Sequence, residues 1–211
     1  MRVVYLAGAA VATVLAIVGV FLLFSGDQPE PRPAPNSPTP TEIPDTPLAR
    51  QPGKAAKVVG RVADERTGLV YPRLGKPWKA RDYAPFSVAQ RIGEVAVPQT
   101  VIASAMVPLD VEPPRSDADY RDIARRTAAW ALRTQHPQGS TLEFIASQPA
   151  PQARGWIMGF AVSYAGGSSR GLVAVVDVGK EKPAMLLATI TDKHRERWRD
   201  LNTLVKGLRT S

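Results

Sequence analysis

The chain has 211 residues, 44% of them hydrophobic and 22% charged, with a formal net charge of +8. This length predicts one modest domain with appendages. Because the sequence contains no cysteine, it excludes disulfides, thiol nucleophiles, Cys-ligated metal centres and a lipoprotein anchor. Its two histidines, His136 and His194, are too few for a metal site that needs three imidazoles.

The N-terminal segment Val3–Phe24 runs for 22 residues without a charge. As a helix it would cover roughly 33 Å, about the thickness of a bilayer core. A cleaved signal peptide is the alternative, but the segment exceeds the usual apolar region of about 7–15 residues, and no small-residue cleavage site closes it. The sequence therefore predicts a single-pass transmembrane anchor over residues 1–26, with Arg2 on the cytoplasmic side and the C-terminal part extracytoplasmic.

Residues 27–53 are rich in proline, with nine prolines between Gln28 and Gly53, and contain almost no large apolar side chain. Such a segment cannot form a core, and it favours an extended conformation at about 3.1 Å per residue. We expect a disordered, semi-rigid linker that holds the following domain as much as roughly 80 Å from the bilayer. A ligand for a proline-binding domain is the alternative interpretation.

Residues 54–211 carry 24 basic and 15 acidic side chains, so the positive charge belongs to this extracytoplasmic domain. A short extended piece is expected at Val70–Pro72. Two apolar runs separated by a proline, Phe86–Val97 and Thr100–Leu109, predict a hairpin. A helix then begins at the capping pattern of Ser116 and ends at His136, which precedes a proline.

Four more strand-like segments follow this helix, and they are separated by Pro-rich or Gly-rich turns that are too short for a crossover helix. They therefore predict an antiparallel meander. A closing helix begins near Asp192 and carries an apolar stripe that includes Leu201 and Leu208. The element order predicts an α+β domain with an antiparallel sheet of about six strands and two main helices. The four segments are Thr141–Ser147, Trp156–Tyr164, Gly171–Val178 and Ala184–Ile190.

This layout resembles the PsbP-like sandwich, an antiparallel sheet with helices packed on it. The stretch Gly68–Pro72, followed by Pro77 and Trp78, also looks like the opening of a family of single-span actinobacterial membrane proteins with a Pro-rich stalk. The resemblances cover about Gly68–Leu208 and imply a noncatalytic accessory role. An NTF2-like cone is the alternative fold, and it normally has more helix before its sheet.

Motifs that carry chemistry are scarce. The segment Gly166–Gly171 contains glycines and hydroxyls but lacks the P-loop lysine, so it predicts a hairpin turn. No nucleophile elbow, zinc-protease or EF-hand pattern occurs, and we therefore predict no catalytic residue, metal ligand or cofactor. The pairing that an enzyme would use is His194 with Asp177 or Asp192.

Two groups of side chains are candidate binding residues. Arginines of the two helices would form one anion-binding surface if the polar faces of these helices lie side by side, although a solvated helix face is the alternative. Tryptophans beside a concave surface would be candidate ligand or partner contacts. The arginines are Arg121, Arg125, Arg195, Arg197 and Arg199, and the tryptophans are Trp78, Trp130 and Trp156.

Together these features predict a membrane-anchored, noncatalytic binding or assembly module at the cell envelope. Its candidate partners are anionic lipid, an acidic wall polymer or an envelope protein. An extracytoplasmic location and the lack of aromatic residues within the basic runs argue against nucleic acid. A cell-envelope hydrolase, or another enzyme with an unrecognised site, is the alternative.

Overall fold

The structure is a computed structural model that describes residues 43–94 and 96–211. The predicted anchor Val3–Phe24 and most of the predicted linker lie outside the described residues. Within the described part, none of the helices has the length and apolar character needed to cross a bilayer.

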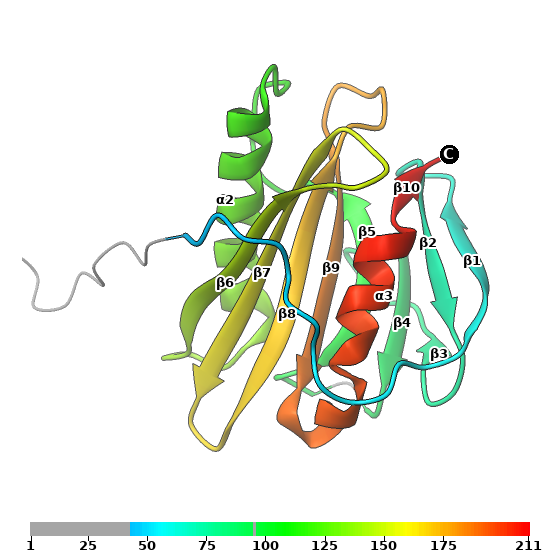
Figure 1. Ribbon diagram of the computed structural model, residues 1–211, viewed down its shortest axis with the longest axis vertical. Coiled ribbons are helices and arrows are strands. Elements are labelled where there is room, and N and C mark those ends of the chain that lie inside the picture. The colour runs from blue at the N-terminus through cyan, green and yellow to red at the C-terminus, as the bar shows by residue number, and fades with distance from the viewer. Residues whose placement is uncertain (1–42, 95) are drawn as a thin grey trace, which may run out of the picture. The chain divides into compact units, whose positions relative to one another are not determined.

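The described residues form ten strands in two antiparallel sheets (Figure 1). The strands are β1 (Val58–Asp64), β2 (Leu69–Leu74), β3 (Lys79–Ala80), β4 (Val88–Ile92), β5 (Thr100–Met106), β6 (Thr141–Pro149), β7 (Gly155–Tyr164), β8 (Gly167–Val176), β9 (Ala184–Thr191) and β10 (Arg209–Thr210). The large sheet has seven strands in the order β3-β4-β5-β9-β8-β7-β6, and the small sheet has three in the order β1-β2-β10. The predicted α+β architecture and the antiparallel β6–β9 meander are confirmed.

The long helix α2 (Asp117–Gln135) has the predicted ends. The Ser116 hydroxyl accepts a hydrogen bond from the Asp119 amide while the Asp119 carboxylate accepts one from the Ser116 amide, so the capping box is complete. His136 is its C-terminal cap, and its backbone N–H donates to the carbonyl of Leu132 at 3.3 Å. Local sequence signals therefore set both ends of this helix.

The predicted closing helix is broken into a 3₁₀ turn, η1 (Asp192–Arg197), and a short helix, α3 (Arg199–Gly207). His194 interrupts η1 with φ −121° and ψ 29°. The Lys54 amide donates to the Glu196 carbonyl at 2.9 Å, so this carbonyl has a partner outside the helix. The N-terminal segment thus replaces one bond of a continuous helix.

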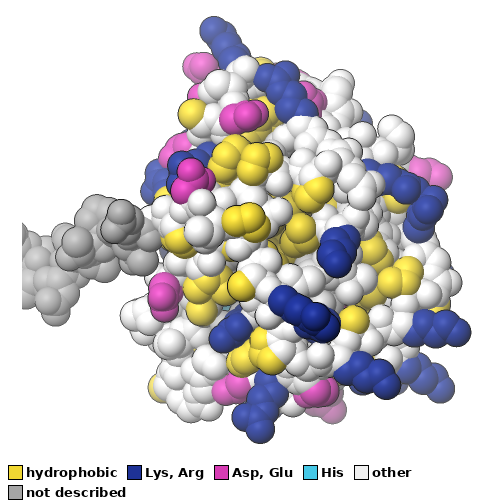
Figure 2. Space-filling model, viewed as in Figure 1, with side chains coloured by type: hydrophobic (Ala, Val, Ile, Leu, Met, Phe, Trp, Pro, Cys, Tyr) yellow, Lys and Arg dark blue, Asp and Glu magenta, His cyan; other side chains and the backbone are white. Residues whose placement is uncertain are grey.

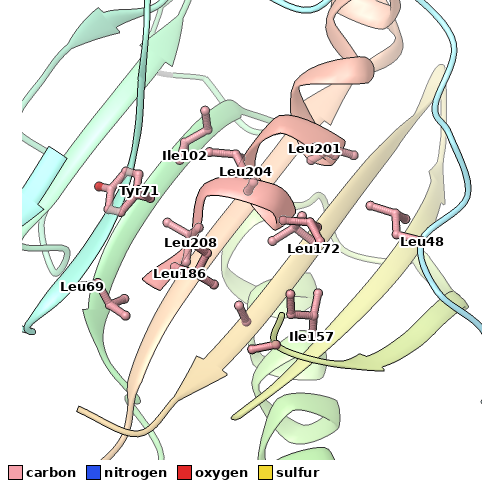
Figure 3. Close-up of a cluster of buried hydrophobic side chains, with 14 of the residues drawn as sticks. Leu48, Leu69, Tyr71, Ile102, Ile157, Leu172, Leu186, Leu201, Leu204 and Leu208 are labelled. Atoms are coloured by element: carbon pink, nitrogen blue, oxygen red, sulfur yellow. The ribbon is translucent and has the colours of Figure 1, made fainter. Parts of the chain in front are cut away.

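The large sheet separates two apolar clusters. Met158 and Phe160 of β7 lie in the cluster beneath α2, whereas Ile157 of β7 and Leu172 of β8 lie in the cluster on the opposite face. The second cluster is closed by α3, the β1–β2 hairpin and the N-terminal segment (Figure 3). The alternation along β7 is the one that its sequence predicts.

Residues 43–57, here called the strap, pack on the domain, although the sequence places residues up to Gly53 in the linker. Leu48 is 8% exposed and belongs to the core in Figure 3. The Ser147 amide donates to the Thr46 carbonyl at 2.9 Å, and the Lys57 carbonyl accepts from the Gly75 amide at 2.8 Å. The packed domain therefore begins upstream of the predicted boundary at Lys54, because Leu48 and several hydrogen bonds attach this Pro-rich segment to the domain.

Candidate anion-binding site

The predicted arginines do not form one surface. Arg121 and Arg125 belong to α2, whereas Arg195, Arg197 and Arg199 belong to η1 and α3. These elements pack on opposite faces of the large sheet (Figure 1). The side-by-side arrangement that a joint anion-binding surface requires is therefore absent from the described residues.

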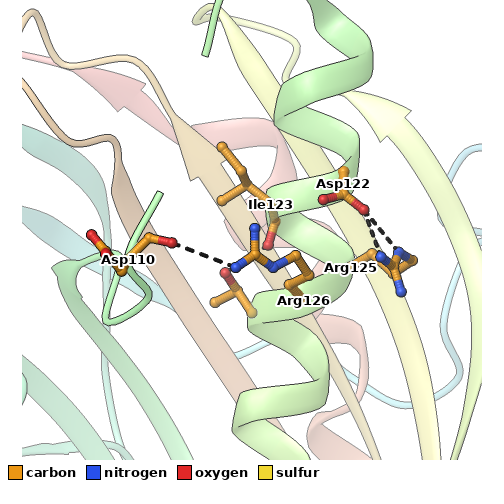
Figure 4. Close-up of polar contacts among 6 residues, drawn as sticks. Asp110, Asp122, Ile123, Arg125 and Arg126 are labelled. Carbon is orange, nitrogen blue, oxygen red and sulfur yellow. Dashed lines mark hydrogen bonds and ion pairs between the residues drawn. The ribbon is translucent and has the colours of Figure 1, made fainter. Parts of the chain in front are cut away.

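The arginines of α2 lie among carboxylates. Arg125 pairs with Asp122 at 2.6 Å, and Arg121 lies 4.0 Å from Asp45. The neighbouring cavity, of about 490 Å³, lies between the first turns of α2 and the loop before it. Arg126 donates to the Asp110 carbonyl there at 3.5 Å (Figure 4). Four acidic and two basic side chains line this cavity, so its charge does not favour an anion: Asp110, Glu112, Asp119, Asp122, Arg115 and Arg126.

Two arginines of the closing segment bind the strap. The Arg197 guanidinium donates to the Lys54 carbonyl at 3.4 Å, and that of Arg199 donates to the Gln51 carbonyl at 3.1 Å. Arg195 is exposed. We conclude that Arg197 and Arg199 hold the strap against α3 and that their donors are partly occupied within the fold.

The three tryptophans make contacts inside the domain. Trp78 is 4% exposed, so it is part of the core and unavailable to a ligand. Trp156 is half-buried and donates from its indole to the Ser147 hydroxyl at 2.8 Å. Trp130 meets the ring of Phe86 edge-on, with ring centres 6.2 Å apart.

A groove of about 420 Å³ lies between the small sheet and the C-terminal end of α3. Its lining contains three basic side chains and no acidic one: Val58, Gly60, Arg61, Pro72, Gln152, Lys206, Gly207 and Arg209. Figure 2 views the α3 side of the molecule, and it shows Lys and Arg side chains gathered over α3 and along the β1–β2 side. We call this groove the basic groove.

Strand register brings the cations of the basic groove together. Arg61 of β1 is paired with Pro72 of β2, and Arg209 of β10 is paired with Val70, two residues earlier on β2. Because side chains two apart in a strand point to the same face, Arg61 and Arg209 share the face that carries Pro72. Lys206 reaches this face from the last turn of α3.

Gly207 allows α3 to end close to the small sheet. A Cβ atom at this position would lie 2.4 Å from Cγ of Pro72, closer than any real contact. A larger residue would push the end of α3 away from β2 and move Lys206 out of the groove. The glycine therefore contributes to the geometry of the site through its missing side chain.

The positive charges of the basic groove have no acidic partner within the described part of the chain. None of its three cations forms an ion pair with a described residue. The side-chain amide of Gln152 donates to the Lys206 carbonyl at 2.6 Å, and the backbone amide of Leu208 donates to the Leu204 carbonyl at 2.9 Å. Two carbonyls at the negative end of α3 are thus already bonded, which reduces their repulsion of an anion.

The pairing proposed for an enzyme does not form. Asp177 follows β8, where its amide donates to the Arg154 carbonyl, whereas His194 lies in η1 at the opposite end of the sheet. The Asp192 carboxylate accepts from the Ser168 amide at 3.0 Å. The fold therefore separates Asp177 from His194, and the Asp192 carboxylate bonds the turn between β7 and β8.

The structure contains a buried Ser–His contact that no sequence pattern indicated. His136 Nε2 and Ser169 Oγ lie 2.7 Å apart, and the two residues are 5% and 1% exposed. Burial lowers the pKa of His136 to about 4, so the imidazole is neutral at neutral pH. Because both partners are shielded from solvent, this contact joins the end of α2 to β8 and exposes no nucleophile.

No family model and no curated protein matches the sequence. Among solved structures, the chain is similar to the solution structure of cyanobacterial PsbP (CyanoP) from Synechocystis sp. PCC 6803. The two share 13% identity with a TM-score of 0.49, over 75% of this chain and 98% of that chain. At this level the similarity assigns no role to any residue described above.

Proposed function

We propose that this protein is a single-pass, membrane-anchored binding module whose extracytoplasmic domain contacts an acidic polymer of the cell envelope through the basic groove. The observation that carries the proposal is the convergence of Arg61, Lys206 and Arg209 on one groove without an acidic lining residue. An anion in this groove would meet cations from β1, α3 and β10. Charge-assisted hydrogen bonds of this kind are stronger than neutral ones.

The proposed location rests on the N-terminal sequence. The uncharged segment Val3–Phe24 is long enough to serve as the anchor, and the acidic residues just after it are consistent with an extracytoplasmic C-terminal part. The groove belongs to the domain that this anchor would hold at the membrane. A binding or assembly role follows from the groove, while anchoring follows from the sequence alone.

The linker favours a wall polymer over the lipid surface. Residues 27–42 would extend about 50 Å in a polyproline conformation. Electrostatic attraction to lipid headgroups decays within a Debye length of about 10 Å, so an extended linker would remove most of it. A polymer with repeated anionic groups can reach the groove at that distance and can contact several cations at once.

The test uses the full-length protein in neutral-detergent micelles with two probes, polyphosphate and poly-glutamate. We expect saturable binding that weakens as salt rises, because added salt shortens the Debye length from about 10 Å at 0.1 M to about 3 Å at 1 M. Changing Arg61, Lys206 and Arg209 to Gln should remove most of the binding. The matched control changes the same number of exposed arginines on α2, Arg125, Arg126 and Arg133, to Gln.

The comparison of these two variants decides the proposal. Equal losses in the groove variant and the α2 variant would show that net charge, and not the groove, causes binding. Absence of binding to both polymers at low salt would refute the proposal. Binding to phosphatidylglycerol vesicles alone would refute the polymer and identify anionic lipid as the partner. Retention of an envelope protein alone would refute the polymer and identify a protein as the partner.

A further inference from the structure

We propose that Arg91 anchors a second binding site, which takes a monocarboxylate in the cavity at the end of β4. This cavity measures about 320 Å³ and is lined by five residues of the segment between β3 and β5: Arg81, Asp82, Arg91, Gly93 and Glu94. It involves none of the residues of the basic groove. We call it the Arg91 cavity.

Arg91 is 3% exposed, which is unusual for a cation. Its guanidinium forms no ion pair with a described residue, although the carboxylates of Asp82 and Glu94 line the same cavity. Position 95, the internal position outside the description, is a valine, whose side chain cannot act as a counter-ion. Burying a cation costs free energy, because it loses its contact with water, unless an anion is buried beside it.

Both hydrogen bonds that Arg91 makes to described residues come from Nη2. Nη2 donates to the Glu94 carbonyl at 3.2 Å and to the Gln99 side-chain oxygen at 2.5 Å. Nε is buried and has no hydrogen-bond partner. Each two-donor face of a guanidinium includes Nη2, which is already bonded here. Nη1 makes no hydrogen bond to a described residue, so it remains as a charged donor to one oxygen of a carboxylate.

The surroundings of Arg91 hold the guanidinium in place. It lies over the ring of Tyr83, 4.9 Å from the ring centre. Gln99 also donates to the Tyr83 hydroxyl at 2.5 Å, and this hydroxyl donates to the Gln135 side chain at 2.7 Å. Gln99 thus connects the two side chains, so the orientation of the guanidinium does not depend on a ligand. Such preorganisation reduces the entropy lost on binding.

The lining charges oppose an anion of more than one charge. Arg81 adds a second cation, but the carboxylates of Asp82 and Glu94 bring the formal charge of the lining to zero. A phosphate dianion would meet stronger repulsion from these two groups than a single carboxylate would. The chemical class is therefore a monocarboxylate, either a small free acid or the C-terminal carboxylate of a peptide.

The test uses the full-length, ¹⁵N-labelled protein in neutral-detergent micelles, with the backbone amide of Gly93 as the NMR reporter. The probes are acetate, N-acetylglycine and, as an uncharged control, N-acetylglycinamide, each compared with chloride at equal ionic strength. We expect saturable shifts with acetate, and none with N-acetylglycinamide or chloride. Saturation by acetate alone indicates a small acid, whereas saturation by N-acetylglycine as well indicates the terminal carboxylate of a peptide.

Variants connect this binding to Arg91. Arg91→Lys keeps the charge but removes the planar guanidinium and its Nη1 donors, and it should weaken carboxylate binding about tenfold or more. If that variant does not fold, Asp82→Asn combined with Glu94→Gln provides an independent test on exposed positions, because loss of these carboxylates should tighten binding. The matched control, Asp110→Asn with Glu112→Gln, removes two exposed acids elsewhere and should leave the affinity unchanged.

Three results would overturn the proposal. The first is no Gly93 shift with either carboxylate. The second is an equal shift with N-acetylglycinamide or chloride, which would indicate an adventitious effect. The third is carboxylate binding that is equally strong in the folded Arg91→Lys variant.

Discussion

The indole Nε1 of Trp78 donates a hydrogen bond of 2.7 Å to Oδ2 of Asp200, a carboxylate with no solvent exposure. The other oxygen of Asp200 accepts from the Ala56 amide of the strap at 2.6 Å. Burial raises the pKa of Asp200, and the bonds from Trp78 and Ala56 oppose that rise. One side chain of α3 therefore joins the strap to the segment before β3.

We expect Asp200→Asn to lower the free energy of unfolding by about 1–3 kcal/mol, because an amide has one acceptor oxygen for two buried donors. Urea unfolding measures this loss, and Glu143→Gln on the exposed part of β6 is the control, with a change of at most about 0.5 kcal/mol. The pKa of Asp200 is raised in the folded state, so its protonation stabilises the folded wild type relative to Asp200→Asn, fully so below the ordinary pKa of 3.8. This contribution to the stability difference should shrink as pH rises through the raised pKa. An advantage that grows with pH would contradict this assignment.

The strap should be required for full stability. A chain that starts at Thr41 keeps the whole strap, whereas one that starts at Lys54 loses Leu48 and the hydrogen bonds of Leu48 and Gln51. We expect the longer chain to fold and the shorter chain to be less stable by about 2–5 kcal/mol, the range for loss of a buried leucine. Thermal unfolding by circular dichroism compares the two chains. Equal melting temperatures would show that residues 43–53 do not stabilise the domain and belong to the linker, as the composition of the sequence suggested.

The apolar stripe of the closing segment docks on the sheet as its spacing predicts. Leu201 has no solvent exposure and lies in the cluster between α3 and the large sheet (Figure 3). Leu201→Ala should lower the free energy of unfolding by about 2–5 kcal/mol. Lys206→Ala, on the exposed side of the same helix, should change it by no more than about 0.5 kcal/mol. A loss below that limit for Leu201→Ala would place its side chain against solvent or a partner.

Elements with local signals were predictable from the sequence. Ser116 and His136 mark the ends of α2 because capping depends on a few neighbouring residues. The strands β6 to β9 follow apolar alternation and Gly-rich or Pro-rich turns, so each was found within a few residues of its ends. The antiparallel order then follows from short connections.

Other elements depend on tertiary contacts and were missed. β1 is an edge strand with a mostly exposed burial pattern, so its alternation is weak, and β10 has only two residues paired with β2. Near the break of the closing helix, the Glu196 carbonyl accepts from the Lys54 amide of the strap. A single sequence does not encode such bonds in any local pattern.

The candidate sites were beyond reach of the sequence for the same reason. Arg61, Lys206 and Arg209 meet because β2 lies between β1 and β10 while α3 ends beside it. In sequence, Arg61 is far from the other two and belongs to no charge run. The arginines that do form a run, around Arg197, partly serve the strap. Charge density along the chain was therefore a poor guide to the position of an open cationic surface.

The buried contact between His136 and Ser169 makes stability dependent on acid. Burial lowers the pKa of His136 from 6.5 to about 4 in the folded state. A histidine with a depressed folded pKa favours folding fully above its unfolded value and loses that contribution as pH falls. The window therefore lies between 6.5 and about 4.

We expect the free energy of unfolding of the wild type to fall by about 3 kcal/mol from this histidine as pH is lowered from neutral to about 4. The reason is that protonation of His136 in the folded state places a charge in a buried site. Urea unfolding of the chain that starts at Thr41 measures this dependence at several pH values. In His136→Gln the acid loss should be smaller by about that amount. If the wild type and His136→Gln lose stability in parallel as pH falls, other groups cause the acid sensitivity, and the contact with Ser169 tolerates a charged imidazole.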